Sequence, residues 1–302
     1  MPPEVSIIII NYNTLSLTRQ CILSVLEKTK DCRYEIILVD NASQEEGIDQ
    51  LQFLSNNVKL IKSSRNLGFA GGNNLGINHA SGEFILLLNS DTELKNNAIK
   101  IGKEVINDDK KIGVLSGSLL NPDGTIQAQA GKFPSALREL SELIRLNKIL
   151  SSRQKSKLYL GTLANYKKIV DADWVWGAFF MFRKTDLELF PDGKLHAAFF
   201  MYVEDMQWCH YFKKTLKKRI IVHPEPKIVH HIGGSDKSKA KGFDRYKEKV
   251  LPNEYDWMVL TKGRLYTSLF YLIKGLHYYT LTRNLENKKK AKTFLKTAII
   301  GY

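Results

Sequence analysis

The chain has 302 residues, enough for one large α/β domain or two ordinary ones, and its 43% hydrophobic and 10% aromatic content excludes a globally disordered protein. Its three cysteines have neither CxxC spacing nor an even count, which excludes a disulfide scaffold and a thiolate zinc site and fits a reducing compartment. The net charge of +14 is concentrated in a tail, because residues 237–302 hold 15 Lys and Arg against 5 Asp and Glu.

The N-terminal segment MPPEVSIIIINYN has no basic region before its apolar run, so we expect no signal peptide. The most apolar stretch, residues 265–281, is interrupted by Lys274, Gly275 and His277 and falls short of the roughly 18 uninterrupted apolar residues that span a membrane. We therefore expect a cytoplasmic protein without a membrane-spanning helix.

The first third of the chain alternates strand and helix patterns, which predicts a mostly parallel sheet with covering helices. Apolar runs predict strands at residues 5–10, 34–40, 58–63 and 84–88. Apolar stripes predict helices at residues 16–29 and 68–80. Strands in this pattern end near Asp40 and Asp91. Because the carboxyl ends of parallel strands share one edge, both carboxylates should face the same crevice.

Beyond residue 112 the pattern changes. Residues 113–127 indicate two strands joined by a Pro-Asp-Gly turn, and the polar, basic segment that follows indicates an excursion or a flexible region up to about residue 168. Residues 171–184 predict one aromatic-rich strand, and a helix is expected from Glu204. Two short strands are predicted within residues 219–235.

The strand at residues 84–88 stops on three polar residues, Asn89, Ser90 and Asp91. All three residue types favour turns, so this stop taken alone indicates a surface turn. The second carboxylate at the same edge, Asp40, favours a site instead, because hard divalent cations are bound by one or two carboxylates together with substrate phosphates.

A glycine-rich segment, RNLGFAGGNN, opens the helix at residues 68–80. It is not the dinucleotide fingerprint GxGxxG, because its glycines are Gly68, Gly71 and Gly72. The segment either packs closely on the sheet or presents the N–H groups of a helix N-terminus to an anionic phosphate.

Two acids, Glu204 and Asp205, follow the apolar residues 199–202. They either stabilise a helix N-terminus or supply a general base whose pKa is raised by apolar surroundings. His230 and His231 end a predicted strand, where a histidine is either structural or a ligand.

Six segments then occur in a recognisable order: VSIIIINYNT, EIILVDNAS, NLGFAGGNN, LLLNSDTEL, WVWGAFFMFRK and FFMYVEDMQWCH with HPEPKIVHHIGGS. This order resembles that of family 2 inverting glycosyltransferases with the GT-A fold, and most of all their bacterial rhamnosyltransferase-like branch, which builds cell-surface polysaccharides. The resemblance covers residues 4–235. It implies an α/β, Rossmann-like fold with a mostly parallel sheet flanked by helices.

The resemblance also implies a nucleotide-sugar donor, a glycan acceptor and Mg²⁺ or Mn²⁺ as cofactor. By this resemblance, Asp205 is the general base and Asp91 binds the cation. The resemblance also implies that His230 completes the metal shell and that Asn89 contacts the metal indirectly. Trp176 and Glu204 contact the acceptor. The implied donor-binding residues are Tyr12, Asn13, Asp40, Asn66, Gly72, Asn73 and Ser90.

The sequence departs from the family pattern at three positions. Asn89 replaces the first acid of the DXD motif, Gln207 replaces the second acid of EDxD, and His210 stands where a basic residue is often found. The implied reaction is one inverting displacement, in which Asp205 removes the proton of the acceptor hydroxyl. The expected donor is dTDP-L-rhamnose and the expected acceptor is a growing, lipid-linked glycan.

We expect a catalytic domain at residues 1–235, with a nucleotide-sugar half (1–120) and an acceptor half (121–235), and a basic helical extension at 236–302. The extension carries an apolar stripe of Leu265, Leu269, Leu272, Leu276 and Tyr279. This stripe either packs on the catalytic domain or a twin subunit in a homodimer, or lies on anionic lipid at the inner face of the cell membrane.

Rival functions are a non-catalytic nucleotide- or glycan-binding module of the same fold, and a transferase that uses a UDP- or GDP-sugar. Nucleic-acid binding is not expected, because the positive charge lies outside the α/β core and no reading motif is present. A Rossmann oxidoreductase is the least expected class, because GxGxxG does not follow the first strand.

Overall fold

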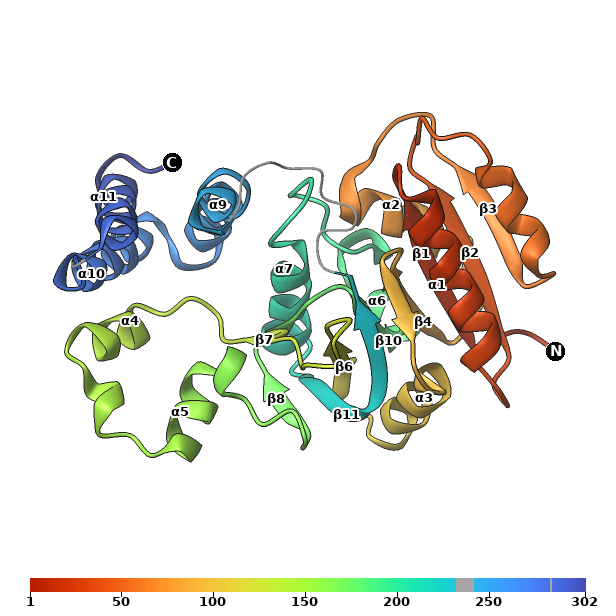
Figure 1. Cartoon of the computed structure of the whole chain (residues 1–302), viewed down its shortest axis with the longest axis horizontal. Helices are drawn as coiled ribbons and strands as arrows, with labels where there is room; N and C mark the ends of the chain where they lie inside the picture. The colour runs from red at the N-terminus through yellow and green to blue at the C-terminus, as the bar shows by residue number, and fades with distance from the viewer. Residues whose placement is uncertain (232–241, 283) are drawn as a thin grey trace. The chain divides into compact units, whose positions relative to one another are not determined.

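The computed structural model describes residues 1–231, 242–282 and 284–302 (Figure 1). It comprises two compact units, each built from two stretches of chain. Unit 1 contains Met1–Gly131 and Ala164–Lys237, and unit 2 contains Lys132–Leu163 and Ser238–Tyr302. Residues 132–163, which the sequence analysis assigned to the acceptor half, thus group with the C-terminal helices. The predicted residues 232–235 lie outside the described part of the chain.

The elements of unit 1 alternate along the chain as the sequence predicts. Its strands are β1 (Val5–Asn11), β2 (Tyr34–Asp40), β3 (Val58–Lys62), β4 (Phe84–Asn89), β5 (Thr92–Leu94), β6 (Ile112–Leu120), β7 (Ala130–Gly131), β8 (Val170–Ala172), β9 (Trp174–Val175), β10 (Phe179–Arg183) and β11 (Arg219–His230). Its helices are α1 (Leu15–Lys28), α2 (Gly68–Ile77), α3 (Ala98–Asp108), α6 (Lys184–Leu187) and α7 (Glu204–His210).

The central sheet has the strand order β3-β2-β1-β4-β10-β6-β11-β5, and β8 pairs with β11 at the side. The pairs β1–β2, β2–β3, β1–β4 and β6–β11 are parallel, whereas β10 and β5 run antiparallel to their neighbours. This confirms a mostly parallel α/β sheet.

Two local predictions differ from the structure. The single strand expected at residues 171–184 is broken into β8, β9 and β10. The two strands expected within residues 219–235 are one strand, β11, whose register shifts between Val222 and Lys227. Pro224 and Pro226 lie in that interval, and because proline has no N–H it cannot donate to a neighbouring strand.

Helices cover both faces of the sheet in unit 1 (Figure 1). On one face α1 and α3 contribute Ile22 and Ile99 to a core cluster that includes Ile7. On the other face α2 lies close to β1, because a Cβ at Gly76 would come within 2.5 Å of Ile8. Gly72 of α2 approaches β1 in the same way, because a Cβ there would lie 3.0 Å from Ile10.

The carboxyl ends of β1, β2 and β4 meet at one edge of the sheet. Asn11 at the end of β1 pairs with Asp40 of β2, and the adjacent Ile10 pairs with Asn89 of β4. The prediction that Asp40 and residues 89–91 share one edge is therefore confirmed.

Unit 2 is helical in the part that the structure describes. Its helices are α4 (Ala136–Leu143), α5 (Ser152–Tyr159), α8 (Gly242–Arg245), α9 (Leu251–Lys262), α10 (Arg264–Thr280) and α11 (Leu285–Ile300). The excursion expected up to residue 168 thus includes two helices. A Cβ at Gly275 of α10 would lie 2.8 Å from Leu295 of α11, so these two helices pack closely. No helix in the described ranges has the length and apolar character needed to cross a bilayer.

The α10 helix buries a different face from the leucine stripe. Phe270 and Tyr271 are buried, whereas Leu265, Leu269 and Leu272 are exposed. Tyr271 stacks on Phe294 of α11 with ring centroids 6.0 Å apart. Aromatic rings bury more area than leucine, which accounts for the orientation of the helix. In the part of the chain that the structure describes, the whole stripe is exposed, including Leu276 and Tyr279.

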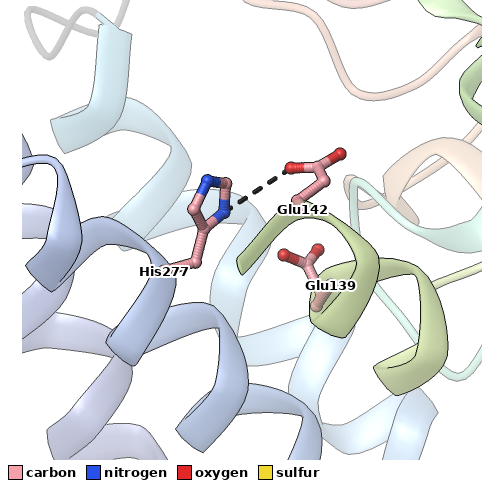
Figure 2. Close-up of side chains that lie close together, drawn as sticks. All are labelled: Glu139, Glu142 and His277. Carbon is pink, nitrogen blue, oxygen red and sulfur yellow. Dashed lines mark ion pairs between the residues drawn. The ribbon is translucent and has the colours of Figure 1, made fainter. Parts of the chain in front are cut away.

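A charged cluster lies where α4 meets α10 (Figure 2). Nδ1 of His277 is 3.5 Å from an Oε2 atom of Glu142, and Glu139 lies beside them. Burial raises the pKa of both glutamates, and the positive charge of Lys274 opposes that rise. This cluster belongs entirely to unit 2.

Candidate active site

Asp91 and His230 face each other at the carboxyl edge of the sheet. Both are buried, and Oδ1 of Asp91 lies 3.4 Å from Nε2 of His230. Antiparallel pairing of β5 with β11 places His230 opposite Thr92, the residue after Asp91. Sheet register therefore brings these two distant parts of the chain together.

His231 has a different partner. Its Nε2 lies 2.9 Å from Oε1 of Glu93, while its backbone N–H donates to the carbonyl of Asp91 at 2.8 Å. Of the two neighbouring histidines, His230 is thus the one whose ring faces Asp91.

A buried glutamine that the sequence analysis did not identify, Gln127, holds His230 from the other side. Its Oε1 lies 3.0 Å from Nδ1 of His230, and its Nε2 donates to the carbonyl oxygens of His230 at 2.8 Å and Leu120 at 3.3 Å. These contacts leave Nε2 of His230 as the ring atom directed at Asp91.

The residues around Asp91 suit a hard divalent cation. A carboxylate oxygen and an imidazole nitrogen are ordinary ligands for such metals, with Mn²⁺ accepting both types. Nearby, Oδ1 of Asn89 is buried and has no hydrogen-bond partner among the described residues. An unsatisfied buried oxygen at this position fits an acceptor for metal-bound water.

Asp40 is linked to this centre by a chain of side chains. Nδ2 of Asn11 contacts Oδ1 of Asp40 at 3.5 Å, and Oδ1 of Asn11 accepts from Thr14 at 3.1 Å. The hydroxyls of Thr14 and Ser90 are 3.2 Å apart. The structure thereby joins two of the predicted donor-binding residues, Asp40 and Ser90, through Asn11 and Thr14, which the sequence analysis did not identify.

The loop after β1 carries the next two predicted donor-binding residues. Tyr12 is exposed. Asn13 adopts a φ of 55°, and its Oδ1 accepts from the backbone of Gln44 at 2.8 Å. Asparagine tolerates this left-handed conformation better than most residues, which explains its presence at the turn.

The glycine-rich segment is fixed by asparagines. Nδ2 of Asn41 donates to Oδ1 of Asn66 at 3.0 Å, and that oxygen also accepts from the N–H of Gly68 at 2.9 Å. A Cβ at Gly72 would lie 3.0 Å from Ile10, while the buried Asn73 donates to the carbonyl of Phe69. Close packing on the sheet is thus present here. Donor contact by Asn66, Gly72 and Asn73 stays a prediction.

Backbone conformation is unusual just before α7. Tyr202 and Val203 have φ values of 71° and 75°, and a positive φ is rare for a β-branched residue such as valine. Strain of this kind clusters at functional sites. The two residues directly precede Glu204 and Asp205, the first residues of α7.

The two acids lie in a desolvated environment. Burial raises the pKa of Asp205, and burial together with the neighbouring Asp205 charge raises the pKa of Glu204. Oδ2 of Asp205 accepts from the N–H of Gly177 at 3.3 Å, whereas Oε2 of Glu204 has no hydrogen-bond partner within the described chain. A carboxylate with a raised pKa is suited to accept a proton near neutral pH.

Trp176 links the acids to the metal-binding candidates. Its ring meets His230 edge-on, with centroids 6.1 Å apart, and the next residue, Gly177, donates to Asp205. Asp91, His230, Trp176 and Asp205 therefore form a continuous series in unit 1. The sequence analysis did not identify Gln127, Asn11 or Asn41 as site residues. The only signal in the sequence is that Asn11 and Asn41 lie at strand ends, because the partners of all three residues are set by tertiary contacts.

Solved structures share the fold of this chain. TarS (1–349) of S. aureus aligns with 98% of this chain and 81% of its own, with a TM-score of 0.54 and 15% identity. The mannosyltransferase PcManGT of Pyrobaculum calidifontis, in complex with GDP-Man and Mn²⁺, aligns with 100% and 77% of the two chains, with a TM-score of 0.53 and 14% identity. At this identity the likeness concerns the fold, which is of the GT-A type.

The family follows from the sequence match. The model of "Glycosyl transferase family 2" matches residues 6–188, more than half of the chain. The chain therefore belongs to glycosyltransferase family 2.

Curated relatives agree with this assignment. The glycosyltransferase GlyG of Streptococcus pneumoniae serotype 4 is 30% identical over 41% of this chain and 41% of its own length. The low-salt glycan biosynthesis hexosyltransferase Agl10 of Haloferax volcanii is 26% identical over 70% of this chain and 62% of its own length. The chain spans less than two thirds of the length of the first curated relatives that it matches.

Proposed function

We propose that this chain transfers a hexose, with inversion, from a nucleotide-sugar donor to a hydroxyl group of a glycan acceptor. One observation carries the proposal: the sheet edge brings the Asp91–His230 pair next to Trp176, whose neighbour Gly177 holds Asp205. A cation ligand pair and a desolvated base are the two groups that a direct displacement requires.

Asp205 acts as the general base in this proposal. Its raised pKa brings its proton affinity closer to the operating pH, which favours removal of the acceptor proton as the hydroxyl attacks the anomeric carbon. Glu204 and Trp176 bind the acceptor, and the strained Tyr202–Val203 backbone fixes the direction of both acids. Attack from the face opposite the nucleotide inverts the anomeric configuration in a single step.

Asp91 and His230 would hold Mg²⁺ or Mn²⁺, with Asn89 contacting the ion through water. When bound, the cation neutralises negative charge on the nucleotide diphosphate. Asp40, Tyr12 and Asn13 bind the nucleotide, and Ser90, Asn66, Gly72 and Asn73 complete the donor site. The complex of PcManGT with GDP-Man and Mn²⁺ supports a metal of this kind.

The proposed donor is dTDP-L-rhamnose, because the six ordered segments resemble those of the rhamnosyltransferase-like branch. PcManGT is solved with GDP-Man, and UDP- and GDP-sugars are the alternative donors of the sequence analysis, so these two classes are the comparison donors. Nucleotide release should be measured for the three donor classes with Mg²⁺ and with Mn²⁺. Release with dTDP-L-rhamnose above the other donors supports the proposal, and no release with any donor contradicts catalysis and favours a binding module.

Unit 2 is proposed to bring the enzyme to a lipid-linked acceptor at the inner face of the cell membrane. It holds 21 Lys and Arg against 7 Asp and Glu, so it carries a net charge of +14, equal to that of the whole chain. The leucine stripe of α10 is exposed within the same unit. Positive charge beside exposed apolar side chains is the combination that binds anionic lipid surfaces.

A further inference from the structure

The orientation of the Gln127 amide follows from its surroundings. Nε2 of Gln127 lies 2.8 Å from the carbonyl oxygen of His230 and 3.3 Å from that of Leu120. Backbone carbonyl oxygens only accept hydrogen bonds, so the NH₂ group must be on this side. The amide oxygen Oε1 is therefore the atom 3.0 Å from Nδ1 of His230.

This orientation sets the protonation of the His230 ring. Because Oε1 of Gln127 only accepts, Nδ1 of His230 must carry the hydrogen that joins the two atoms. In the neutral imidazole the second nitrogen, Nε2, then has a free lone pair. That lone pair is directed at the Asp91 carboxylate, 3.4 Å away.

We propose that Gln127 is a positioning residue that holds His230 in the Nδ1–H tautomer and thereby keeps Nε2 free opposite Asp91. Bonds to the ring and to the main chain of the same histidine fix both its rotation and its tautomer. Partners of this kind orient metal-ligating histidines in general. The purpose of the arrangement rests on the proposed function, but the tautomer is a property of the folded, metal-free chain.

Gln127 is itself held in place. Its backbone N–H donates to the carbonyl of Leu119 at 2.8 Å, and its Nε2 also lies 2.9 Å from Oδ1 of Asn121, which shares the two hydrogens of the NH₂ group. The side chain is buried. Because its position depends on β6 and the turn that follows, Gln127 connects this strand to the end of β11.

The test is ¹⁵N NMR of the metal-free full chain with labelled histidine at pH 8, where free imidazole is neutral. The ring signals of His230 are assigned by their loss in His230→Gln. We expect a protonated Nδ1 and an unprotonated Nε2. A ring protonated on Nε2, or an equal mixture of tautomers, would overturn the proposal whether or not the chain has transferase activity.

A variant series adds a second readout. Gln127→Leu should lose the fixed tautomer and bind Mn²⁺ about 10- to 100-fold more weakly by calorimetry. Gln127→Glu keeps an acceptor for Nδ1–H but loses the NH₂ donor to the His230 carbonyl, so it should keep the hydrogen on Nδ1 while holding the ring less firmly. Gln129→Leu is the matched control, because Gln129 is also buried but bonds to Ser116 and Gly117.

An unchanged tautomer and an unchanged Mn²⁺ affinity in folded Gln127→Leu would contradict the positioning role of Gln127. Absence of Mn²⁺ binding in the wild type, with the tautomer as expected, would instead contradict the proposed metal.

Discussion

Nε2 of His230 lies 3.4 Å from Oδ1 of Asp91, both within the buried carboxyl edge of the sheet. With the hydrogen on Nδ1, two atoms that only accept face each other, and a divalent cation held by these two residues would relieve the repulsion. We expect Asp91→Asn to lower metal-dependent turnover at least about 100-fold. The measurement is nucleotide release against Mn²⁺ concentration.

Asn89→Ala is the comparison for that experiment, because Asn89 is proposed to contact the metal only through water. It should reduce turnover less than Asp91→Asn does. Equal losses in the two variants would contradict the division of roles between the two side chains.

The raised pKa of Asp205 predicts the pH dependence of the reaction. Burial stabilises the protonated acid, so the active carboxylate is lost as the pH falls through a pKa above the ordinary value of about 3.9. We expect kcat/KM to fall with an acid limb well above that value. A kcat/KM that stays constant from pH 8 down to pH 4.5 would exclude a desolvated carboxylate as base.

Gly68 carries both a steric and a conformational requirement. Its φ is +71°, and a Cβ would lie 2.3 Å from the carbonyl oxygen of Phe200. Gly68→Ala should lower the free energy of unfolding by about 1–3 kcal/mol and also weaken donor binding. Gly124→Ala is the matched control, because Gly124 has a φ of +84° with no atom within 4 Å. Equal losses of stability in both variants would show that the Phe200 contact contributes nothing.

Much of unit 1 could be predicted from the sequence, because apolar runs such as residues 84–88 identify strands buried on both faces. The shared edge of Asp40 and Asp91 follows from the same pattern. Gln127 could not be predicted, since its role depends on pairing between distant strands. The exposed side of α10 was also not evident: its leucine spacing is regular, but Phe270 and Tyr271 form the packed face.

Glu139 in the cluster of Figure 2 should make stability depend on pH. Burial raises the pKa of Glu139 in the folded chain, so the folded state is more stable when Glu139 is protonated than when it is ionised. The stabilisation is present below the unfolded pKa and is lost as the pH rises through the folded pKa. Glu139→Gln should therefore melt at a higher temperature than the wild type at pH 8, and the difference should shrink toward pH 4. The exposed Glu248→Gln serves as control, and a lower melting temperature for Glu139→Gln at pH 8 would show that its charge is stabilising.

The exposed leucines of α10 should contribute to binding of anionic vesicles. Serine at Leu269, Leu272 and Leu276 together should reduce sedimentation with phosphatidylglycerol vesicles, because each buried CH₂ group contributes about 0.8 kcal/mol. Serine at Leu189, an exposed leucine of unit 1, is the control. Equal sedimentation of the triple variant and the wild type would contradict a lipid-facing α10.

The central claim, that Asp205 is the base of an inverting transfer, is tested most directly by comparing Asp205→Asn with the wild type. Nucleotide release would be measured with saturating donor, acceptor and Mn²⁺, and donor affinity would be measured separately by calorimetry. The exposed Asp192→Asn is the control, because Asp192 has a φ of 57° that asparagine tolerates. We predict that Asp205→Asn loses about 100- to 10,000-fold in turnover while donor affinity is retained. Turnover equal to that of Asp192→Asn would contradict the account.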